Sequence, residues 1–379
     1  MCITMKDLKA KGFSVNEFAG DAKKLVDYDF RDDCIWKRRG CSDDELNKKR
    51  GDFIGIDSSI EKFFIYKFEG ESFTENQKKN YKKACKFMDD KGYGKVKLVD
   101  PDSNSSLLQE IYRKLWNKPI LKLCNDKTIH GDTMNSVTTT LNEYVRFIFL
   151  EYVRFYGSKE IDGPFTDKDG KPLKAIKEET LEIYCQAKED FIRYCIQENR
   201  GLDKFLKASY TLGNFIPVPF ESGGGQFNAP RYKNTNDYWD LTLLRIYNWY
   251  KENESLEKDA ILEKIENECD CNKNKELCLL LGRNCANVKL CIKWLCAFGS
   301  WKEFVEKNYM QPFVGKEDVN GNYGAPLELW EGHFKRYEDG IFKNPLPLCK
   351  EQCEEFFKNA TKRIKERSER MAEKFRSAK

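Results

Sequence analysis

The chain has 379 residues, 40% of them hydrophobic and 13% aromatic, so it can bury a sizeable core and is not a disordered segment. Its 66 basic residues nearly balance its 62 acidic residues, and a net charge of +4 excludes the strong uniform field of a general nucleic-acid binder. No apolar run is long enough to span a membrane, and the first residues lack the apolar core of a secretory signal. We therefore expect a cytoplasmic protein with no membrane contact.

The pattern of apolar residues predicts a mainly α, α+β protein, that is, a helical globular protein with a few short strands. Runs of β-branched and aromatic residues predict these strands near residues 53–69, 94–100 and 210–219. We expect two domains from the length. The first is an N-terminal α+β region, residues 1–100, and the second is a helical main domain, residues 101–379, which contains a polar motif region at 210–243.

Helical periodicity accounts for most of the main domain. The predicted helices span residues 107–116, 139–156, 178–198, 235–250, 256–268 and 288–309, with a long C-terminal helix from Lys350. The helix at 139–156 is the most apolar, so we expect it to be central. The last helix combines an apolar stripe with a basic end, which is typical of a solvated helix C-terminus.

The 15 cysteines are an odd number in a long chain without a signal sequence, which favours free thiols in a reducing compartment. One dense cluster comprises Cys269, Cys271, Cys278, Cys285, Cys291 and Cys296. A zinc site usually takes paired C-x-x-C knuckles, and this cluster has one C-x-C followed by irregular gaps. Buried inert thiols are therefore the preferred interpretation, and we predict no metal, although metal binding by the cluster stays open.

A first polar stretch lies just before the predicted helix at 139–156. His130, one of only two histidines, stands beside Asp132, and the two could act as a general base or as metal ligands. They are the candidate catalytic residues. The alternative is helix capping, because Asp132, Thr133, Asn135 and Ser136 are all good N-cap residues.

The polar motif region contains the strongest functional lead. Tyr210–Pro219 reads as a tight bend that enters an extended strand at a sheet edge, and a flexible glycine run follows it. Asp237 is expected to cap the next helix, and amides gathered with Arg231 at a helix start suit an anion or phosphate site. The candidate ligand-binding residues are Asn214, Asn228, Arg231, Asp237 and Asp240. The alternative is a structural corner, with the asparagines bonded to backbone and Arg231 paired with Asp237 or Asp240.

Several motifs in this part of the chain resemble a known family. Gly131-Asp-Thr-Met-Asn-Ser136, the Tyr210–Pro219 segment, Phe227-Asn with Arg231, and Asp237-Tyr-Trp-Asp-Leu-Thr-Leu243 are similar to motifs of a bacterial and phage family of hypothetical proteins with a domain of unknown function. The resemblance extends from about Asp100 to the C-terminal helix. It implies a bacterial or phage origin and brings no activity, cofactor or site residue with it.

A second resemblance concerns Gly213-Asn214-Phe215 and the later Asn228. Endonucleases with a His-Asn-His metal finger carry a similar Gly-Asn segment and a downstream Asn, together with an upstream Asp-His. Here the upstream place reads His130-Gly-Asp132, in changed order, and no second histidine stands near Asn228. The resemblance implies a divergent metal-dependent nuclease or phosphohydrolase that uses His130, Asp132, Asn214 and Asn228.

Motif searches narrow the function only in part. The chain has no P-loop, no dinucleotide-binding glycine pattern, no HExxH and no GxSxG. We therefore expect an intracellular binding or interaction protein with a polar pocket around Asn214, Asn228 and Arg231. The alternatives are the nuclease and a nucleotide or phosphate binder, so the partner is a protein, a nucleotide or a nucleic acid. Whether the protein is an enzyme, which cofactor it takes and its oligomeric state stay open.

Overall fold

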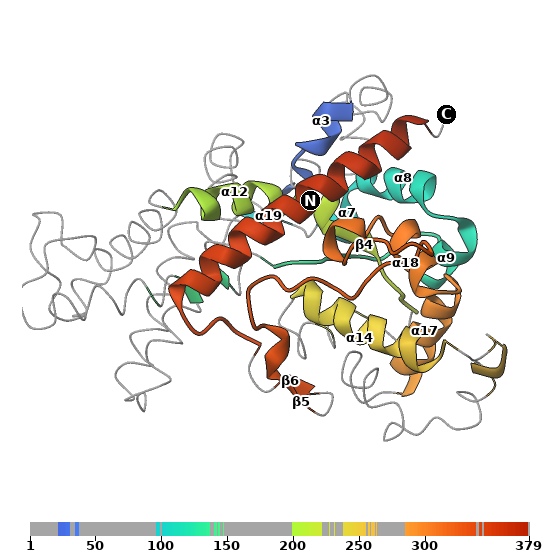
Figure 1. Ribbon diagram of the computed structural model, residues 1–379. Coiled ribbons are helices and arrows are strands. Elements are labelled where there is room, and N and C mark those ends of the chain that lie inside the picture. The colour runs from blue at the N-terminus through green and yellow to red at the C-terminus, as the bar shows by residue number, and fades with distance from the viewer. Residues whose placement is uncertain are drawn as a thin grey trace, which may run out of the picture.

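The computed structural model describes residues 22–30, 35–37, 96–98, 101–136, 140–141, 143–144, 147, 199–221, 227, 231, 238–254, 257, 259–261, 263, 285–338, 341–342 and 345–377. These residues form a mainly helical protein, as the sequence predicts (Figure 1). The described helices are α3 (Ala22–Val26), α7 (Pro101–Asn104), α8 (Ser106–Leu115), α9 (Lys118–Leu123), α12 (Arg200–Ala208), α14 (Trp239–Glu252), α17 (Cys285–Cys296), α18 (Trp301–Lys307) and α19 (Lys350–Ser377). Within the described residues, no helix is both long enough and apolar enough to cross a membrane.

The described strands form three short antiparallel pairs. β1 (Ile35–Lys37) pairs with β2 (Val96–Leu98), β3 (Gly131–Thr133) with β4 (Phe215–Pro217), and β5 (Tyr337–Glu338) with β6 (Ile341–Phe342). The strands predicted near 94–100 and 210–219 are therefore confirmed as β2 and β4. The strand prediction near 53–69 and the helix prediction at 178–198 lie outside the described residues.

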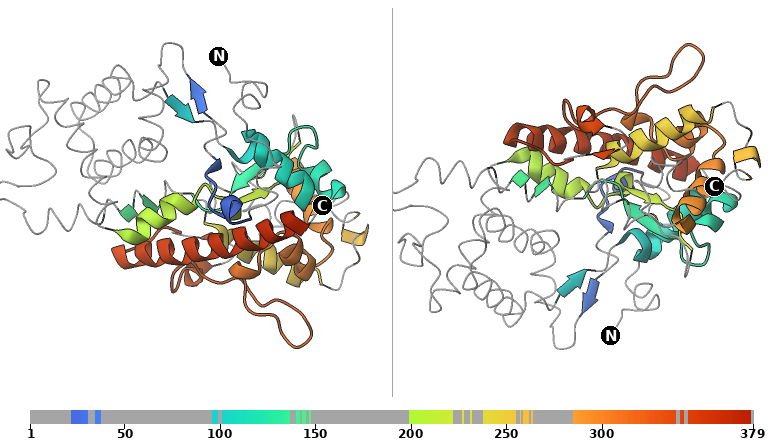
Figure 2. Two further views of the ribbon diagram at one scale, coloured as in Figure 1. Left: turned by 90° about the horizontal axis from the view of Figure 1, so that it is seen from above. Right: turned by 90° about the horizontal axis from the view of Figure 1, so that it is seen from below.

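Helix α19 runs the length of the described body, and α12 lies alongside it in the views of Figures 1 and 2. Its buried side chains recur at helical spacing and give it one continuous apolar face. These side chains include Phe356, Phe357, Ala360, Ile364, Met371 and Phe375. The predicted C-terminal helix is thus confirmed, and it is the element against which α3, α12 and α8 pack.

The start of the polar motif region packs against the middle of α19. A short 3₁₀ helix, η3 (Leu212–Asn214), passes so close to α19 that a Cβ on Gly213 would lie 1.8 Å from the Ile364 carbonyl oxygen. Ser368 Oγ accepts a hydrogen bond from the Gly213 amide, and Arg367 donates to the carbonyls of Gly213 and Phe215. Burial lowers the pKa of this guanidinium to about 9. Hydrogen bonds from its backbone to the Ser368 and Arg367 side chains therefore hold this segment against α19.

The predicted helix at 288–309 is wrong in one respect, because the chain forms two helices there. Gly299 adopts a φ of 86°, which favours glycine and ends α17. Ser300 then caps α18, because its side chain accepts a hydrogen bond from the Glu303 amide. The apolar spacing continues through this break, so periodicity alone could not reveal it.

The expected cap of α14 is also corrected. The N-cap position is Tyr238, and its side chain makes no capping bond. The Oδ1 atom of Asn135 instead accepts a hydrogen bond from the Trp239 amide at 3.2 Å. A residue about a hundred positions earlier therefore satisfies the helix start, and Asp237 lies outside the described residues.

Candidate functional site

Asp132 and Arg231, two of the predicted site residues, form an ion pair. Arg231 Nε lies 2.6 Å from Asp132 Oδ2, and the guanidinium also donates to the carbonyls of Thr133 and Met134. The Arg231 side chain is fully buried and that of Asp132 is 10% exposed. Burial raises the pKa of the Asp132 carboxyl above its usual range, and the Arg231 guanidinium opposes this shift. Among the described residues Arg231 thus pairs with Asp132, whereas the alternative from the sequence paired it with Asp237, which lies outside the described residues, or with Asp240.

The strand register explains why Asp132 can reach Arg231. Asp132 is the middle residue of β3, directly opposite Ile216 of β4. The predicted capping role of Asp132 and Thr133 is wrong because these residues form a strand and not the start of a helix. A buried charge of this kind is tolerated only when a partner and hydrogen bonds satisfy it, and Arg231 supplies both.

Asn214 is fully buried and bonds to backbone at both ends of its amide. Its Nδ2 donates to the carbonyls of Asn135 and Ser209, at 3.0 and 2.7 Å. Its Oδ1 accepts the Asn135 amide at 3.0 Å. Since Asn135 also caps α14, these bonds link η3, the end of β3 and the start of α14. This is the role that the structural alternative assigned to Asn214.

Asp240 faces the other histidine of the chain. Its Oδ2 lies 2.7 Å from His333 Nδ1 and 2.8 Å from the Leu329 amide nitrogen, and both side chains are fully buried. His333 Nε2 lies 3.0 Å from the Pro345 carbonyl oxygen, which can only accept, so this nitrogen carries a proton. The pair therefore ties α14 to the segment before α19. Asn228 and Asp237 lie outside the described residues.

His130 occupies a different environment from these buried groups. It is half-buried, its ring packs on Phe220 with 4.3 Å between ring centroids, and its Nδ1 lies 2.9 Å from Ser103 Oγ. Burial lowers the pKa of the His130 imidazole, and the nearby Asp132 carboxylate opposes this shift. Ser103 lies in α7 and was not among the candidate residues predicted from the sequence, because no local motif surrounds it.

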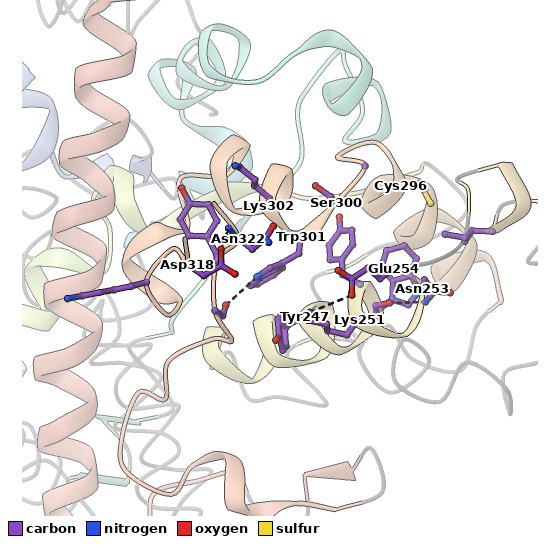
Figure 3. Close-up of a pocket in the computed structure, with 17 residues that line it drawn as sticks. Tyr247, Lys251, Asn253, Glu254, Cys296, Ser300, Trp301, Lys302, Asp318 and Asn322 are labelled. Atoms are coloured by element: carbon purple, nitrogen blue, oxygen red, sulfur yellow. Dashed lines mark hydrogen bonds and ion pairs between the residues drawn. The ribbon is translucent and has the colours of Figure 1, made fainter. Parts of the chain in front are cut away.

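An open pocket lies away from all of these residues. Its volume is about 490 Å³, and it lies between the end of α14, the junction of α17 and α18, and the loop at 314–326 (Figure 3). In Figure 3, Tyr247 and Lys251 belong to α14, Trp301 and Lys302 to the start of α18, and Asp318 to the loop. The sequence predicts helices over several of these residues but assigns none of the five a role in binding.

Aromatic rings make up much of the pocket wall. Tyr247 and Trp301 meet edge to face at 5.2 Å, and Tyr250 and Tyr323 also line the pocket. Trp301 Nε1 donates to the Gly324 carbonyl at 3.3 Å, which fixes the ring against the loop. The loop itself is a narrow hairpin that projects from the body in both views of Figure 2.

Three lysines and two carboxylates add charge to the pocket lining. Lys251 pairs with Glu254 at 3.5 Å, and Lys302 pairs with Glu317 at 3.8 Å. Lys316 has no ion-pair partner among the residues that the structure describes. Asp318 accepts the amides of Asn322 and Asn320, and these bonds lower its carboxyl pKa. Among the described residues, no carboxylate therefore pairs with the Lys316 amine.

The described residues give no sign of a metal site. Within them, no group of three His, Cys, Asp or Glu side chains is close enough to hold an ion. Cys291 and Cys296 are buried free thiols, and Cys269, Cys271 and Cys278 lie outside the described residues. Burial raises the pKa of the Cys291 thiol far above its usual range, which makes a thiolate ligand unfavourable there.

Comparison with known proteins does not assign this chain to a family. No family model, no curated protein and no solved structure matches this chain. The resemblances described from the sequence motifs therefore stay predictions, and the function has to be argued from the arrangement of side chains alone.

Proposed function

We propose that the protein binds a small planar molecule that carries a negative charge, in the pocket between α14, α18 and the 314–326 loop. The observation that carries this proposal is the combination of aromatic rings and Lys316, which has no ion-pair partner among the described residues, around one open cavity of about 490 Å³. Nucleotides belong to this class of ligand, because they join a planar base to a phosphate.

The size and the lining support a ligand site. Pockets that bind small molecules typically measure roughly 300–1,000 Å³ and combine apolar walls with a few polar groups that set orientation. Tyr247 and Tyr323 are half-buried, so part of each ring faces the open side. A planar ligand ring can pack on such faces, while the Lys316 amine attracts its anionic group.

The predicted polar pocket around Asn214 and Arg231 offers less support for ligand binding. Both side chains are fully buried, and their hydrogen bonds run to backbone and to Asp132. A ligand there would have to replace bonds that hold the fold together, at a cost in stability. The same holds for a nuclease site, since Asp132 would have to leave Arg231 before it could bind a metal.

Thermal-shift measurements with nucleoside monophosphates, followed by calorimetric titration, test the proposal. A ligand that binds only the folded state must raise the melting temperature. Lys316→Glu is expected to abolish the shift, because it reverses the charge of the unpaired amine. The matched control is Lys365→Glu, an exposed lysine on α19 that does not line the pocket.

Two outcomes of these measurements would contradict the proposal. A panel of purine and pyrimidine monophosphates at millimolar concentration that leaves the melting temperature unchanged would exclude a nucleotide-class ligand. An equal loss of binding in the Lys316 and Lys365 variants would mean that net charge, and not the pocket, governs binding.

A further inference from the structure

We propose that Ser103 and His130 form a nucleophile–base pair that reacts with carboxylic esters and related acyl or phosphoryl electrophiles. This site is separate from the aromatic pocket, and neither residue lines it. The two side chains come from positions 27 residues apart, at the end of α7 and just before β3.

The direction of the hydrogen bonds supports this role. The Gly131 amide donates to Ser103 Oγ at 3.0 Å, so the hydroxyl proton is left to point elsewhere. His130 Nδ1 lies 2.9 Å from Oγ, whereas the Gly131 carbonyl lies at 3.5 Å. In the tautomer that carries its proton on Nε2, the His130 Nδ1 atom can accept this proton, as a general base does with its nucleophile.

Two neighbouring residues hold the pair in this geometry. A Cβ on Gly131 would lie 2.2 Å from the Asp102 carbonyl oxygen, so only glycine lets the α7 turn approach β3 this closely. Gln109 of α8 bonds to both sides of the pair. Its Nε2 donates to the carbonyls of Ser103 and Ile129, and its Oε1 accepts the Ile129 amide. Gln109 is thus a positioning residue for the Ser103–His130 pair.

The environment of His130 suits a base at neutral pH. Desolvation keeps the imidazole neutral, and Phe220 packs on its ring. Among the described residues, the charged group that acts on His130 is the Asp132 carboxylate, which itself pairs with the Arg231 guanidinium. Ser103 and His130 are only partly buried, in contrast to the sealed Asp240–His333 pair, so a reagent can reach them.

The chemistry balances without a cofactor. Ser103 Oγ forms a bond to the ester carbonyl carbon as its proton passes to His130, and the π electron pair of the carbonyl moves onto the carbonyl oxygen. When this pair re-forms the carbonyl, the bond from the carbon to the alkoxy oxygen breaks, and His130 returns the proton to the departing alkoxide. Water, activated by the same imidazole, hydrolyses the acylated serine and restores the hydroxyl group.

A fluorophosphonate probe tests the proposal, because its phosphorus bonds to an activated serine oxygen as fluoride leaves. Peptide mapping by mass spectrometry is expected to place the label on Ser103, with labelling lost in Ser103→Ala and slowed at least tenfold in His130→Gln. Ser377→Ala, which removes an exposed serine at the end of α19 outside both sites, is the control and should label like the unaltered chain.

The pH profile of the unaltered chain provides a test that does not depend on the folding of any variant. Since burial lowers the pKa of His130, its neutral base form persists below the ordinary histidine value of about 6.5. Labelling should therefore rise with pH to a plateau, with its midpoint below that value. Labelling of Ser103 no faster than that of Ser377, or a rate that keeps rising through alkaline pH, would overturn the proposal.

Discussion

The buried polar cluster and the open aromatic pocket differ in the hydrogen-bond and ion-pair partners of their polar side chains. In the buried cluster, which comprises Asp132, Arg231, Asn214, Asp240 and His333, the hydrogen bonds run to backbone or to one another. In the pocket, Lys316 has no ion-pair partner within the described residues, and part of the aromatic surface faces solvent. The same polar residue types therefore stabilise the fold in one region and remain accessible in the other.

This difference shows how a polar motif can mislead. A segment such as Thr211–Pro217 is rich in unusual residues because it runs through the interior, where each backbone group needs a partner. Gly213 permits contact with α19, and Asn214 satisfies three backbone groups. The pocket, in contrast, is lined mainly by residues of three separate segments, none of which carries a sequence motif.

The largest expected effect comes from breaking the buried ion pair. Arg231→Met leaves the Asp132 carboxylate buried without its partner, and removal of one partner of such a pair costs about 3–5 kcal/mol of unfolding free energy. Urea denaturation measures this loss, with Arg370→Met on the exposed side of α19 as the control. Removal of the unpaired carboxylate as well, in the double variant Asp132→Ala/Arg231→Met, should restore part of the lost stability. A double variant no more stable than Arg231→Met alone would show that the ion pair does not stabilise the buried cluster.

A smaller loss of stability is expected at Asn214. Asn214→Ala removes the partners of the Asn135 amide and of the carbonyls of Asn135 and Ser209. Buried groups left without partners cost about 1–3 kcal/mol, and the same denaturation experiment measures it. A stable Asn214→Ala variant that loses nucleotide binding would instead place the ligand site in the buried cluster.

Substitutions in the pocket should lower the affinity for the ligand rather than the stability of the fold. Tyr247→Leu removes a ring that meets Trp301 and faces the cavity, and loss of base stacking costs about 1–3 kcal/mol of binding free energy. Calorimetric titration with the tightest nucleoside monophosphate measures the change. An unaltered affinity would show that the ligand does not pack on this wall.

The smallest effect on stability is expected at Lys316. Because its side chain is exposed and unpaired within the described residues, Lys316→Ala should leave the melting temperature of the free protein unchanged. The same variant should weaken nucleotide binding. A lower melting temperature in the absence of ligand would mean that Lys316 already has a structural partner.

The sequence predicts the elements whose signals are local. Apolar spacing identified α8 and α19, and β-branched runs identified β2 and β4. It did not predict the break at Gly299, because the apolar spacing continues across it, nor the cap of α14, because Asn135 reaches that helix only in the folded chain.

The functional residues were harder to predict for the same reason. His130 and Asp132 were singled out, but the approach of Ser103 depends on the contact between α7 and β3. The pocket needs the ends of three distant segments to meet, and no residue pattern within any one of them indicates this.

Hydrogen–deuterium exchange with and without a saturating nucleoside monophosphate distinguishes the open pocket from the buried cluster as the binding site. We expect slower exchange at residues 299–302 and 316–324, which border the pocket, and no change at 131–135 and 213–217, which are already bonded internally. Protection confined to 131–135 and 213–217 would show that the ligand binds in the buried cluster and not in the pocket.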